Sequence, residues 1–312
     1  EIARQAGLAL AANGCIWVDE TMRSSDPNIF AGGDCAAVPH RVTGRPGYFP
    51  FGSLANRQGR VIGSNLAGGR DRFPGSVGSF ILKLFDVAVA GTGLSLASAK
   101  RAGFDAVSAK AELYDRAHFY PDKALMFLEL VVERHTRRVL GLHGISTNGM
   151  GLMARINAVA AILPLRPGLQ DIANLEVAYS PPFAGAMDAI NAIANVAENI
   201  LEGRNAPVDM DETMDLWAKA KSDPKGPVFL DCRMHGNQEL ATRHPDAWRL
   251  VPLDQLRTEA GSLPTDRPLV AFCNSGLLSY EARLLLSRAG FADVSNVEGG
   301  MNLVKRSGIT LE

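Results

Sequence analysis

The sequence lacks several features that would assign its class at once. It has no apolar run approaching the ~20 residues of a transmembrane helix, which argues against a membrane protein. Its net charge of -1 indicates no general attraction to nucleic acid or anionic membranes. Its four cysteines, Cys15, Cys35, Cys232 and Cys273, lie far apart without metal-ligand spacing. They therefore favour reduced thiols in a cytoplasmic protein over a disulfide framework or a metal site.

The chain also has no initiator methionine, because it starts with Glu1-Ile2-Ala3-Arg4, and it has no signal-peptide pattern. We therefore expect a fragment or a trimmed protein. A length of 312 residues predicts about two or three domains.

The first segment, residues 1–72, contains a glycine pair followed by an acidic residue. The apolar run 29–31 predicts a brief buried strand. Gly32 and Gly33 let the backbone approach a ligand closely, and Asp34 then stands at the strand end. A carboxylate there can accept hydrogen bonds from sugar-like hydroxyls, as acidic residues do in dinucleotide folds. The alternative is a simple Asx turn.

The string 22–36 resembles the second flavin-binding motif of the pyridine nucleotide-disulfide oxidoreductases. The resemblance implies that Asp34 binds the ribityl chain of FAD, with Gly32 and Gly33 close to the cofactor.

Residues 50–69 predict a helix with a glycine-rich end. The same family places this helix N-terminus against the flavin ring, which implies contacts from Leu54 and Ala55. The run 55–60, Ala-Asn-Arg-Gln-Gly-Arg, is most similar to the coenzyme A-disulfide reductases and NADH-dependent persulfide reductases. Alternatively, Arg57 and Arg60 form only a solvated helix face.

The middle segment, residues 74–203, is rich in strand patterns and ends in helices. Strands are expected near 80–93, 124–133 and 139–144, and helices near 95–102, 151–163 and 186–201. This order resembles the dimerisation domain that ends each reductase of the family, and it implies a homodimer.

Two tyrosines of the middle segment lie beside prolines, Tyr120 before Pro121 and Tyr179 before Ser180-Pro181. In coenzyme A-disulfide reductases, similar segments reach into the partner subunit's active site, where phenols can hydrogen-bond a thiolate or persulfide leaving group. The resemblance therefore implies catalytic roles for Tyr120 and Tyr179. The alternative is that these loops only pack a dimer interface.

The last segment, residues 208–312, alternates short apolar strands with helices, which predicts a small α/β domain with a largely parallel sheet. The strand 268–272 ends on Cys273, and a helix is expected to open at Ser279. Backbone N–H groups and the helix dipole at such a position favour thiolate over thiol, which makes Cys273 a candidate nucleophile. A buried structural cysteine is the alternative.

The whole segment resembles a rhodanese domain, whose active loop has the Cys-x-x-Gly spacing of Cys273 and Gly276. This resemblance implies that Cys273 carries sulfur as a persulfide. Leu278 stands where many rhodaneses carry Arg, so a catalytically silent domain is the alternative. A cysteine phosphatase is disfavoured because it needs a loop Arg to bind phosphate.

Together the segments predict a multidomain α/β and α+β chain: the end of an FAD-binding Rossmann-like domain, an α+β dimerisation domain and a rhodanese domain. The resemblance implies a fragment of a flavin-dependent NAD(P)H disulfide or persulfide reductase of the coenzyme A-disulfide type. It implies FAD, coenzyme A as a further ligand, and NADH or NADPH bound through an upstream domain. Persulfide, polysulfide or coenzyme A disulfide would be the substrate. The alternatives are an NADH oxidase or peroxidase of the same superfamily and a dimerising scaffold.

Overall fold

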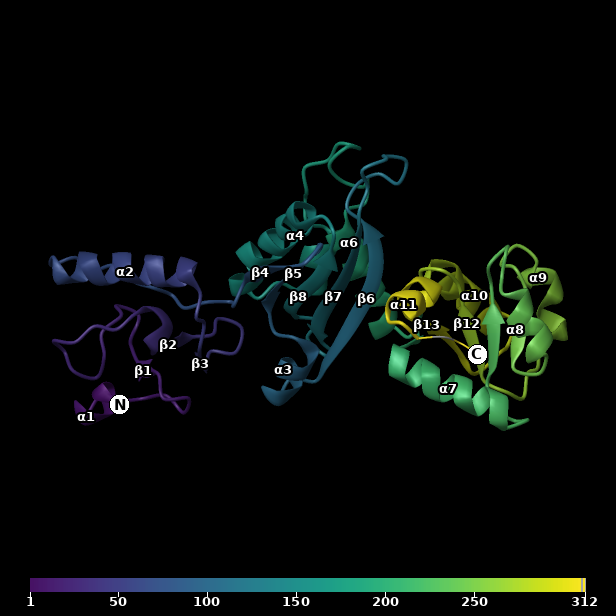
Figure 1. Ribbon diagram of the computed structural model, residues 1–312, viewed down its shortest axis with the longest axis horizontal. Helices are drawn as coiled ribbons and strands as arrows, with labels where there is room; N and C mark the ends of the chain where they lie inside the picture. The colour runs from purple at the N-terminus through teal and green to yellow at the C-terminus, as the bar shows by residue number, and fades with distance from the viewer. Residues whose placement is uncertain (310, 312) are drawn as a thin grey trace. The chain divides into compact units, whose positions relative to one another are not determined.

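The computed structural model describes residues 1–309 and residue 311 (Figure 1). Residues 310 and 312, at the end of the third predicted domain, lie outside the described residues. The chain divides into two compact units, one of residues 1–107 and 130–172 and one of residues 108–129 and 173–312. Because these units divide the predicted middle domain, the three domain boundaries of the sequence analysis stay predictions.

The first part of the chain forms a small three-stranded sheet. Its strands are β1 (Ile16–Trp17), β2 (Ala36–Pro39) and β3 (Pro46–Gly47), in that order, with β1 and β2 parallel and β2 and β3 antiparallel. Helix α1 (Ile2–Gln5) precedes them, a short 3-10 turn (Gly33–Cys35) leads into β2, and α2 (Gly52–Leu66) follows. The strand expected at 29–31 is wrong: Phe30 makes only an isolated bridge to Arg23. Gly33 has φ +72°, so the backbone turns there and the strand forms after it.

The middle part forms a five-stranded sheet in the order β4-β5-β8-β7-β6. Its strands are β4 (Phe80–Leu84), β5 (Val87–Gly93), β6 (Ala106–Tyr114), β7 (Leu125–Glu133) and β8 (Val139–Ser146). Its helices are α3 (Leu96–Arg101), α4 (Gly149–Ile162), the 3-10 turn Leu163–Leu165, α5 (Leu169–Ala173) and α6 (Ala189–Leu201). All the helices expected here are present, whereas β6 was not expected.

The last part forms a five-stranded sheet in which all pairings are parallel. Its order is β11-β10-β12-β13-β9, with β9 (Pro207–Val208), β10 (Val228–Asp231), β11 (Trp248–Leu250), β12 (Leu269–Phe272) and β13 (Val294–Val297). The helices are α7 (Met210–Ser222), α8 (Gln238–Arg243), α9 (Leu256–Glu259), the 3-10 turn Ala260–Ser262, α10 (Leu277–Arg288) and α11 (Gly300–Arg306). The predicted small parallel α/β domain is therefore present.

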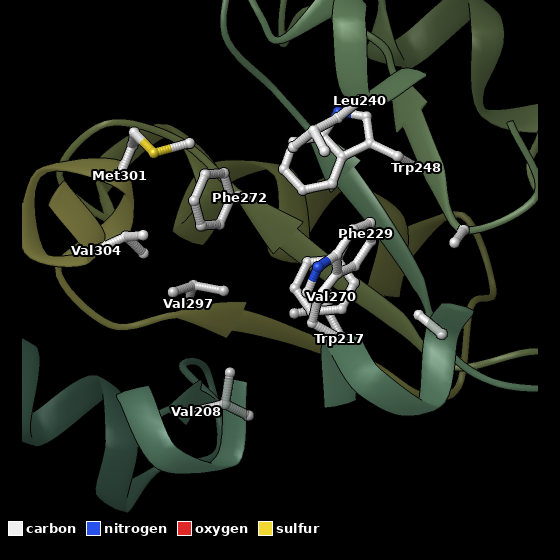
Figure 2. Packing of buried hydrophobic residues seen from close by; sticks show 12 residues of the cluster. Val208, Trp217, Phe229, Leu240, Trp248, Val270, Phe272, Val297, Met301 and Val304 are labelled. Carbon is white, nitrogen blue, oxygen red and sulfur yellow. The ribbon is translucent and has the colours of Figure 1, made fainter. Parts of the chain in front are cut away.

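Successive side chains of these parallel strands point to opposite faces, so the sheet has two cores. On one face, Leu230 and Ala271 pack with residues of α9 and α10. On the other face, Phe229 and Phe272 pack with residues of α7, α8 and α11, as Figure 2 shows. Trp248 joins these two phenylalanines, since its ring centroid lies 6.0 Å from that of Phe229 and 5.5 Å from that of Phe272. Helices on both faces explain why every strand residue of β10 and β12 is buried.

None of the described helices is long and apolar enough to cross a membrane. Among the residues that the structure describes, no three His, Cys, Asp or Glu side chains gather in a way that could hold a metal ion.

Candidate active site

Three neighbouring parallel strands bring polar residues to one edge of the last sheet. β10 ends on Asp231, β12 leads into Cys273, and β13 leads into Glu298. The register pairs Asp231 with Phe272, which places Cys273 one residue beyond the end of β10. Ligands and reacting groups commonly lie at this carboxyl edge of a parallel sheet.

Cys273 lies at the bottom of a loop that closes around its sulfur. The Gly276 amide donates a hydrogen bond to the Cys273 Sγ at 3.1 Å, and the Ser279 Oγ lies 3.5 Å from it. Gly276 has φ +98°, a left-handed conformation that a side chain would disfavour. Helix α10 begins at Leu277, two residues before the predicted start. The sulfur therefore lies by the N-terminus of α10 and accepts from the Gly276 amide, an arrangement that favours a thiolate or persulfide anion.

The backbone of α11 contacts the same loop through the carbonyl groups of Cys273 and Asn274. The amides of Met301 and Asn302, in the first turn of α11, donate to the carbonyl oxygens of Cys273 and Asn274 at 2.8 and 2.9 Å. A Cβ placed on Gly300 would lie 2.3 Å from the Cys273 carbonyl oxygen. The Glu-Gly-Gly sequence thus allows α11 to contact the loop directly.

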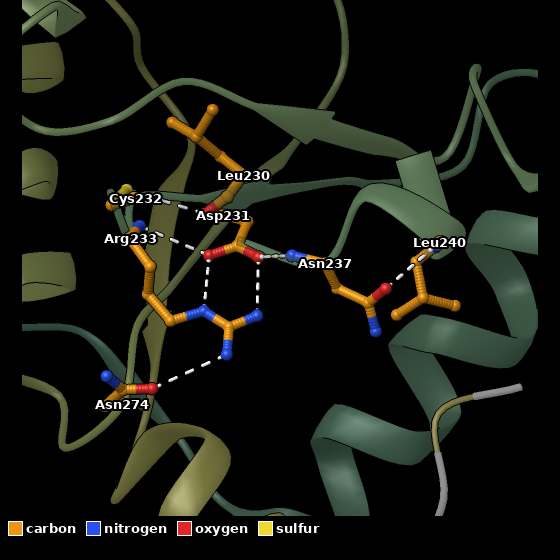
Figure 3. A network of polar contacts seen from close by, with 7 residues as sticks. All are labelled: Leu230, Asp231, Cys232, Arg233, Asn237, Leu240 and Asn274. Atoms are coloured by element: carbon orange, nitrogen blue, oxygen red, sulfur yellow. Dashed lines mark hydrogen bonds and ion pairs between the residues drawn. The ribbon is translucent and has the colours of Figure 1, made fainter. Parts of the chain in front are cut away.

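An ion pair from the end of β10 flanks the loop (Figure 3). The Arg233 Nε and Nη2 atoms donate to the two carboxylate oxygens of Asp231 at 2.8 and 2.6 Å. The Asn237 amide also donates to Asp231, at 2.9 Å. The remaining Arg233 nitrogen, Nη1, lies 3.5 Å from the Asn274 Oδ1. The network joins the end of β10 to the residue that follows Cys273.

The adjacent thiol, Cys232, has a different environment. Its side chain is buried with the apolar core on the α10 face of the sheet. Burial, together with the charges of Cys273 and Asp231, raises the pKa of Cys232 to about 12, although a hydrogen bond from the backbone opposes the shift. Cys232 therefore remains a thiol at neutral pH.

The predicted flavin residues also lie close together, in the first unit. The Gly33 amide donates to the Gln58 Oε1 of α2 at 2.6 Å, and a Cβ on Gly33 would lie 3.5 Å from the Ala55 Cβ. A Cβ on Gly32 would meet the Ile62 side chain at 2.8 Å. The glycine pair thus allows the turn to pack directly against α2, where Ala55 lies.

The N-terminus of α2 is available to an acceptor from outside the helix. The helix has no side-chain cap, so the amides of its first two residues, Gly52 and Ser53, are at its open end. The Leu54 and Ala55 amides donate to the Phe51 carbonyl within the helix. The Asp34 side chain is exposed in the turn beside it. Next to the first turn of α2 lies a cavity of about 430 Å³ whose lining includes Arg41, Ser53, Leu54, Arg57 and Asn157.

The two predicted tyrosines lie on loops of the second unit that are hydrogen-bonded to each other. Tyr120 follows β6 and Tyr179 precedes α6. The Ala117 amide donates to the Pro181 carbonyl at 3.2 Å, which joins the loops. The Tyr179 side chain is 54% exposed, so its phenol is free to meet another molecule. Both loops lie outside the sheet that carries Cys273.

Sequence reasoning missed Arg233, Asn274, Ser279 and Gly300 as parts of the Cys273 site. The available signal was the Asp-x-Arg sequence directly after an apolar strand, because charged residues at a strand's carboxyl end face the same edge as the Cys loop.

Comparison with protein families finds three successive matches. Residues 1–57 match a pyridine nucleotide-disulphide oxidoreductase model, residues 80–190 match the dimerisation domain of those oxidoreductases, and residues 214–307 match a rhodanese-like domain. This order of domains confirms the predicted fold class.

Comparison with individual proteins finds relatives that reduce sulfur compounds or oxidise NADH. An NAD(P)H sulfur oxidoreductase (CoA-dependent) of Pyrococcus abyssi is 36% identical over 63% of this chain and 43% of that protein. An NADH oxidase of Methanocaldococcus jannaschii is 31% identical over 62% of the chain and 44% of that protein. The solved structure of an NAD-dependent persulfide reductase from A. fulgidus matches with a TM-score of 0.84 and 37% identity, over 96% of this chain and 52% of that one. The chain thus spans about half the length of these relatives.

Proposed function

Because the chain belongs to the pyridine nucleotide-disulphide oxidoreductases and carries a rhodanese-like domain, we propose that it is part of a flavin-dependent NAD(P)H reductase of persulfides or coenzyme A disulfides. The names of its sulfur-reducing relatives support this class of substrate. The observation that carries the proposal within this chain is the Cys273 sulfur, held by the Gly276 amide at the N-terminus of α10.

Cys273 acts as the sulfur carrier of this enzyme. The thiolate attacks the outer sulfur of a persulfide R–S–S⁻, a new S–S bond forms on Cys273, and R–S⁻ leaves with the electron pair of the broken bond. Charge is conserved, since two monoanions give a Cys273 persulfide anion and a thiolate. The Gly276 amide is positioned to stabilise the anion in both forms. The Ser279 hydroxyl donates its proton to the Gly276 carbonyl at 3.1 Å.

The first unit holds the residues proposed to bind FAD, which supplies redox chemistry when bound. The Asp34 side chain is exposed and can accept from ribityl hydroxyls, and Gly32 and Gly33 keep the backbone clear of side chains there. Leu54 and Ala55 lie in the uncapped first turn of α2, which can face the pyrimidine edge of the flavin. These observations fit the group, and the assignment of each residue is part of the proposal.

We also propose a homodimer, in which the loops of Tyr120 and Tyr179 meet the active site of the partner subunit. The dimerisation-domain match over residues 80–190 and the exposure of Tyr179 support this arrangement. Coenzyme A is proposed as a further ligand, in line with the name of the Pyrococcus relative. The four free cysteines fit a location in the reducing cytoplasm.

A steady-state assay of the protein that contains this chain tests the proposal. We expect purified protein to show a flavin absorbance spectrum and to oxidise NADH or NADPH when coenzyme A persulfide or polysulfide is added. Under air without a sulfur substrate, oxidation should be at least about tenfold slower. Equal turnover with oxygen alone would instead indicate an NADH oxidase, and protein without flavin or turnover would indicate a scaffold.

A further inference from the structure

The loop that holds Cys273 has no positive charge of its own. Residues 273–279 read Cys-Asn-Ser-Gly-Leu-Leu-Ser, without a Lys, Arg or His. Asp231 and Glu298 are buried acidic groups at the same sheet edge, and Asp209 follows β9 at this edge too. A thiolate or persulfide on Cys273 would add a further negative charge to this edge, and burial makes such repulsion costly.

We propose that Arg233 is a positioning residue for Cys273. It supplies the positive charge that the Cys273 loop lacks, and it holds Asn274, the residue that follows Cys273. The inference rests on the proposed sulfur-carrier function of Cys273. Arg233 is held rigidly, because two of its nitrogens bond both carboxylate oxygens of Asp231 at 2.8 and 2.6 Å. Its third nitrogen is directed to the Asn274 Oδ1 at 3.5 Å, and its side chain is only 12% exposed (Figure 3).

The surroundings of Arg233 support an electrostatic role. Its guanidinium carbon lies 5.8 Å from the centre of the Phe272 ring, directly before Cys273 in the chain. The pKa of Arg233 is raised first by its hydrogen bond to Asp231, and then by the negative charges of Asp231 and Cys273, although burial opposes the shift. Coulombic attraction acts on both partners, so a negative charge placed on Cys273 would be attracted to Arg233.

Two further ionisable groups at this edge, Glu298 and Cys232, are already compensated or neutral. The Glu298 carboxylate forms an ion pair with the Lys110 Nζ at 2.9 Å. Burial raises the pKa of Glu298, and its pairing with Lys110 opposes that shift. Cys232, with its pKa near 12, is uncharged at neutral pH. The net charge of the Asp231–Arg233 pair therefore determines the electrostatic effect of the β10 end on Cys273.

Two substitutions change this balance in opposite directions. Arg233→Met leaves the Asp231 carboxylate uncompensated beside Cys273, whereas Asp231→Asn leaves the guanidinium uncompensated. We expect the midpoint of the pH dependence of Cys273 alkylation to rise by about one pH unit in Arg233→Met and to fall in Asp231→Asn. The measurement is the rate of iodoacetamide labelling of the tryptic peptide that carries Cys273, followed by mass spectrometry across pH.

A purely structural ion pair predicts a different result, because either substitution breaks the same pair. Midpoints that move in the same direction, or that do not move, would overturn the proposal. Circular dichroism and thermal melting show whether each variant folds. Should Arg233→Met fail to fold, Arg233→Lys can replace it, because lysine keeps the charge but cannot form the bidentate hydrogen bonds to Asp231. A labelling midpoint within about 0.3 pH unit of the parent would support the charge role.

Placing a positive charge at position 278 instead of position 233 provides a second, independent test. Leu278 lies in the first turn of α10 and is 36% exposed, so an arginine can be accommodated there. We expect Leu278→Arg to bring the labelling midpoint of Arg233→Met back toward the parent value, and to restore persulfide loading of Cys273 at least about fivefold. No recovery in either measurement would argue against the charge role. Labelling needs no sulfur donor, so the parent protein failing to load sulfur would refute the proposed function without affecting this test.

Discussion

Replacing Cys273 with serine is expected to lower sulfane-sulfur transfer by about a thousandfold or more. A serine oxygen cannot form the S–S bond that carries sulfur, even though the Gly276 amide remains in place to hold it. The parent chain should gain the mass of one sulfur atom on the Cys273 peptide after incubation with a persulfide donor. The serine variant should gain none.

Cys232 provides the matched control for this experiment. It directly follows β10, as Cys273 directly follows the paired strand β12, yet its pKa of about 12 keeps it protonated between pH 6 and 9, where loading is measured. We therefore expect Cys232→Ala to load sulfur within about threefold of the parent rate. A raised thiol pKa means that the reactive thiolate appears only as the pH approaches 12. The loading rate of Cys232→Ala should therefore stay close to that of the parent throughout pH 6 to 9. Sulfur on Cys232, with Cys273 unmodified, would contradict the assignment of the carrier.

Replacing Gly300 with alanine should damage the Cys273 loop from the opposite side. The new Cβ would lie 2.3 Å from the Cys273 carbonyl and 2.7 Å from the Asn274 carbonyl carbon, so the loop or α11 must move. Gly300 also has φ +55°, which disfavours a side chain. We expect a loss of about 2–4 kcal/mol in the free energy of unfolding and at least a tenfold slower loading of Cys273.

Gly290→Ala separates the effect of the left-handed backbone conformation from the effect of the steric clash. Gly290 has φ +94°, but a Cβ there would meet no atom within 4 Å. This variant should lose only the ~1–2 kcal/mol of the left-handed conformation and should load sulfur at the parent rate. Denaturant unfolding and the sulfur-loading assay measure both quantities. Equal effects of Gly290→Ala and Gly300→Ala on loading would show that the close approach of α11 is unimportant.

The last sheet was predictable because its strands are fully buried. Residues 228–230 of β10 and Leu269–Phe272 are continuous apolar runs, as expected for a parallel sheet covered on both faces. β6 (Ala106–Tyr114) was missed although apolar and polar residues alternate from Val107 to Leu113, which is the period-two pattern of a strand. No range was predicted for helix α7, although Asp209 caps it by accepting a hydrogen bond from the Glu212 amide.

The same contrast holds for the site. Cys273 and Gly276 could be located because their spacing lies within one loop. Arg233 lies forty residues earlier in the sequence, and only the pairing of β10 with β12 brings it to Asn274. Gly300 depends in the same way on where α11 docks. The roles of Tyr120, Tyr179, Asp34, Leu54 and Ala55 remain predictions, since they concern a cofactor and a partner subunit.

The aromatic core behind the Cys273 loop gives this protein an internal optical reporter. The sequence has three tryptophans, of which Trp217 and Trp248 are about 1% exposed in the last sheet's core and Trp17 is 37% exposed in the first unit. The Trp248 ring meets the Phe272 ring edge-on, one residue from Cys273, the proposed sulfur carrier. In a Trp17→Phe background, tryptophan emission would come from this core alone. Stopped-flow fluorescence could then follow the arrival and departure of sulfur at Cys273 without an added dye.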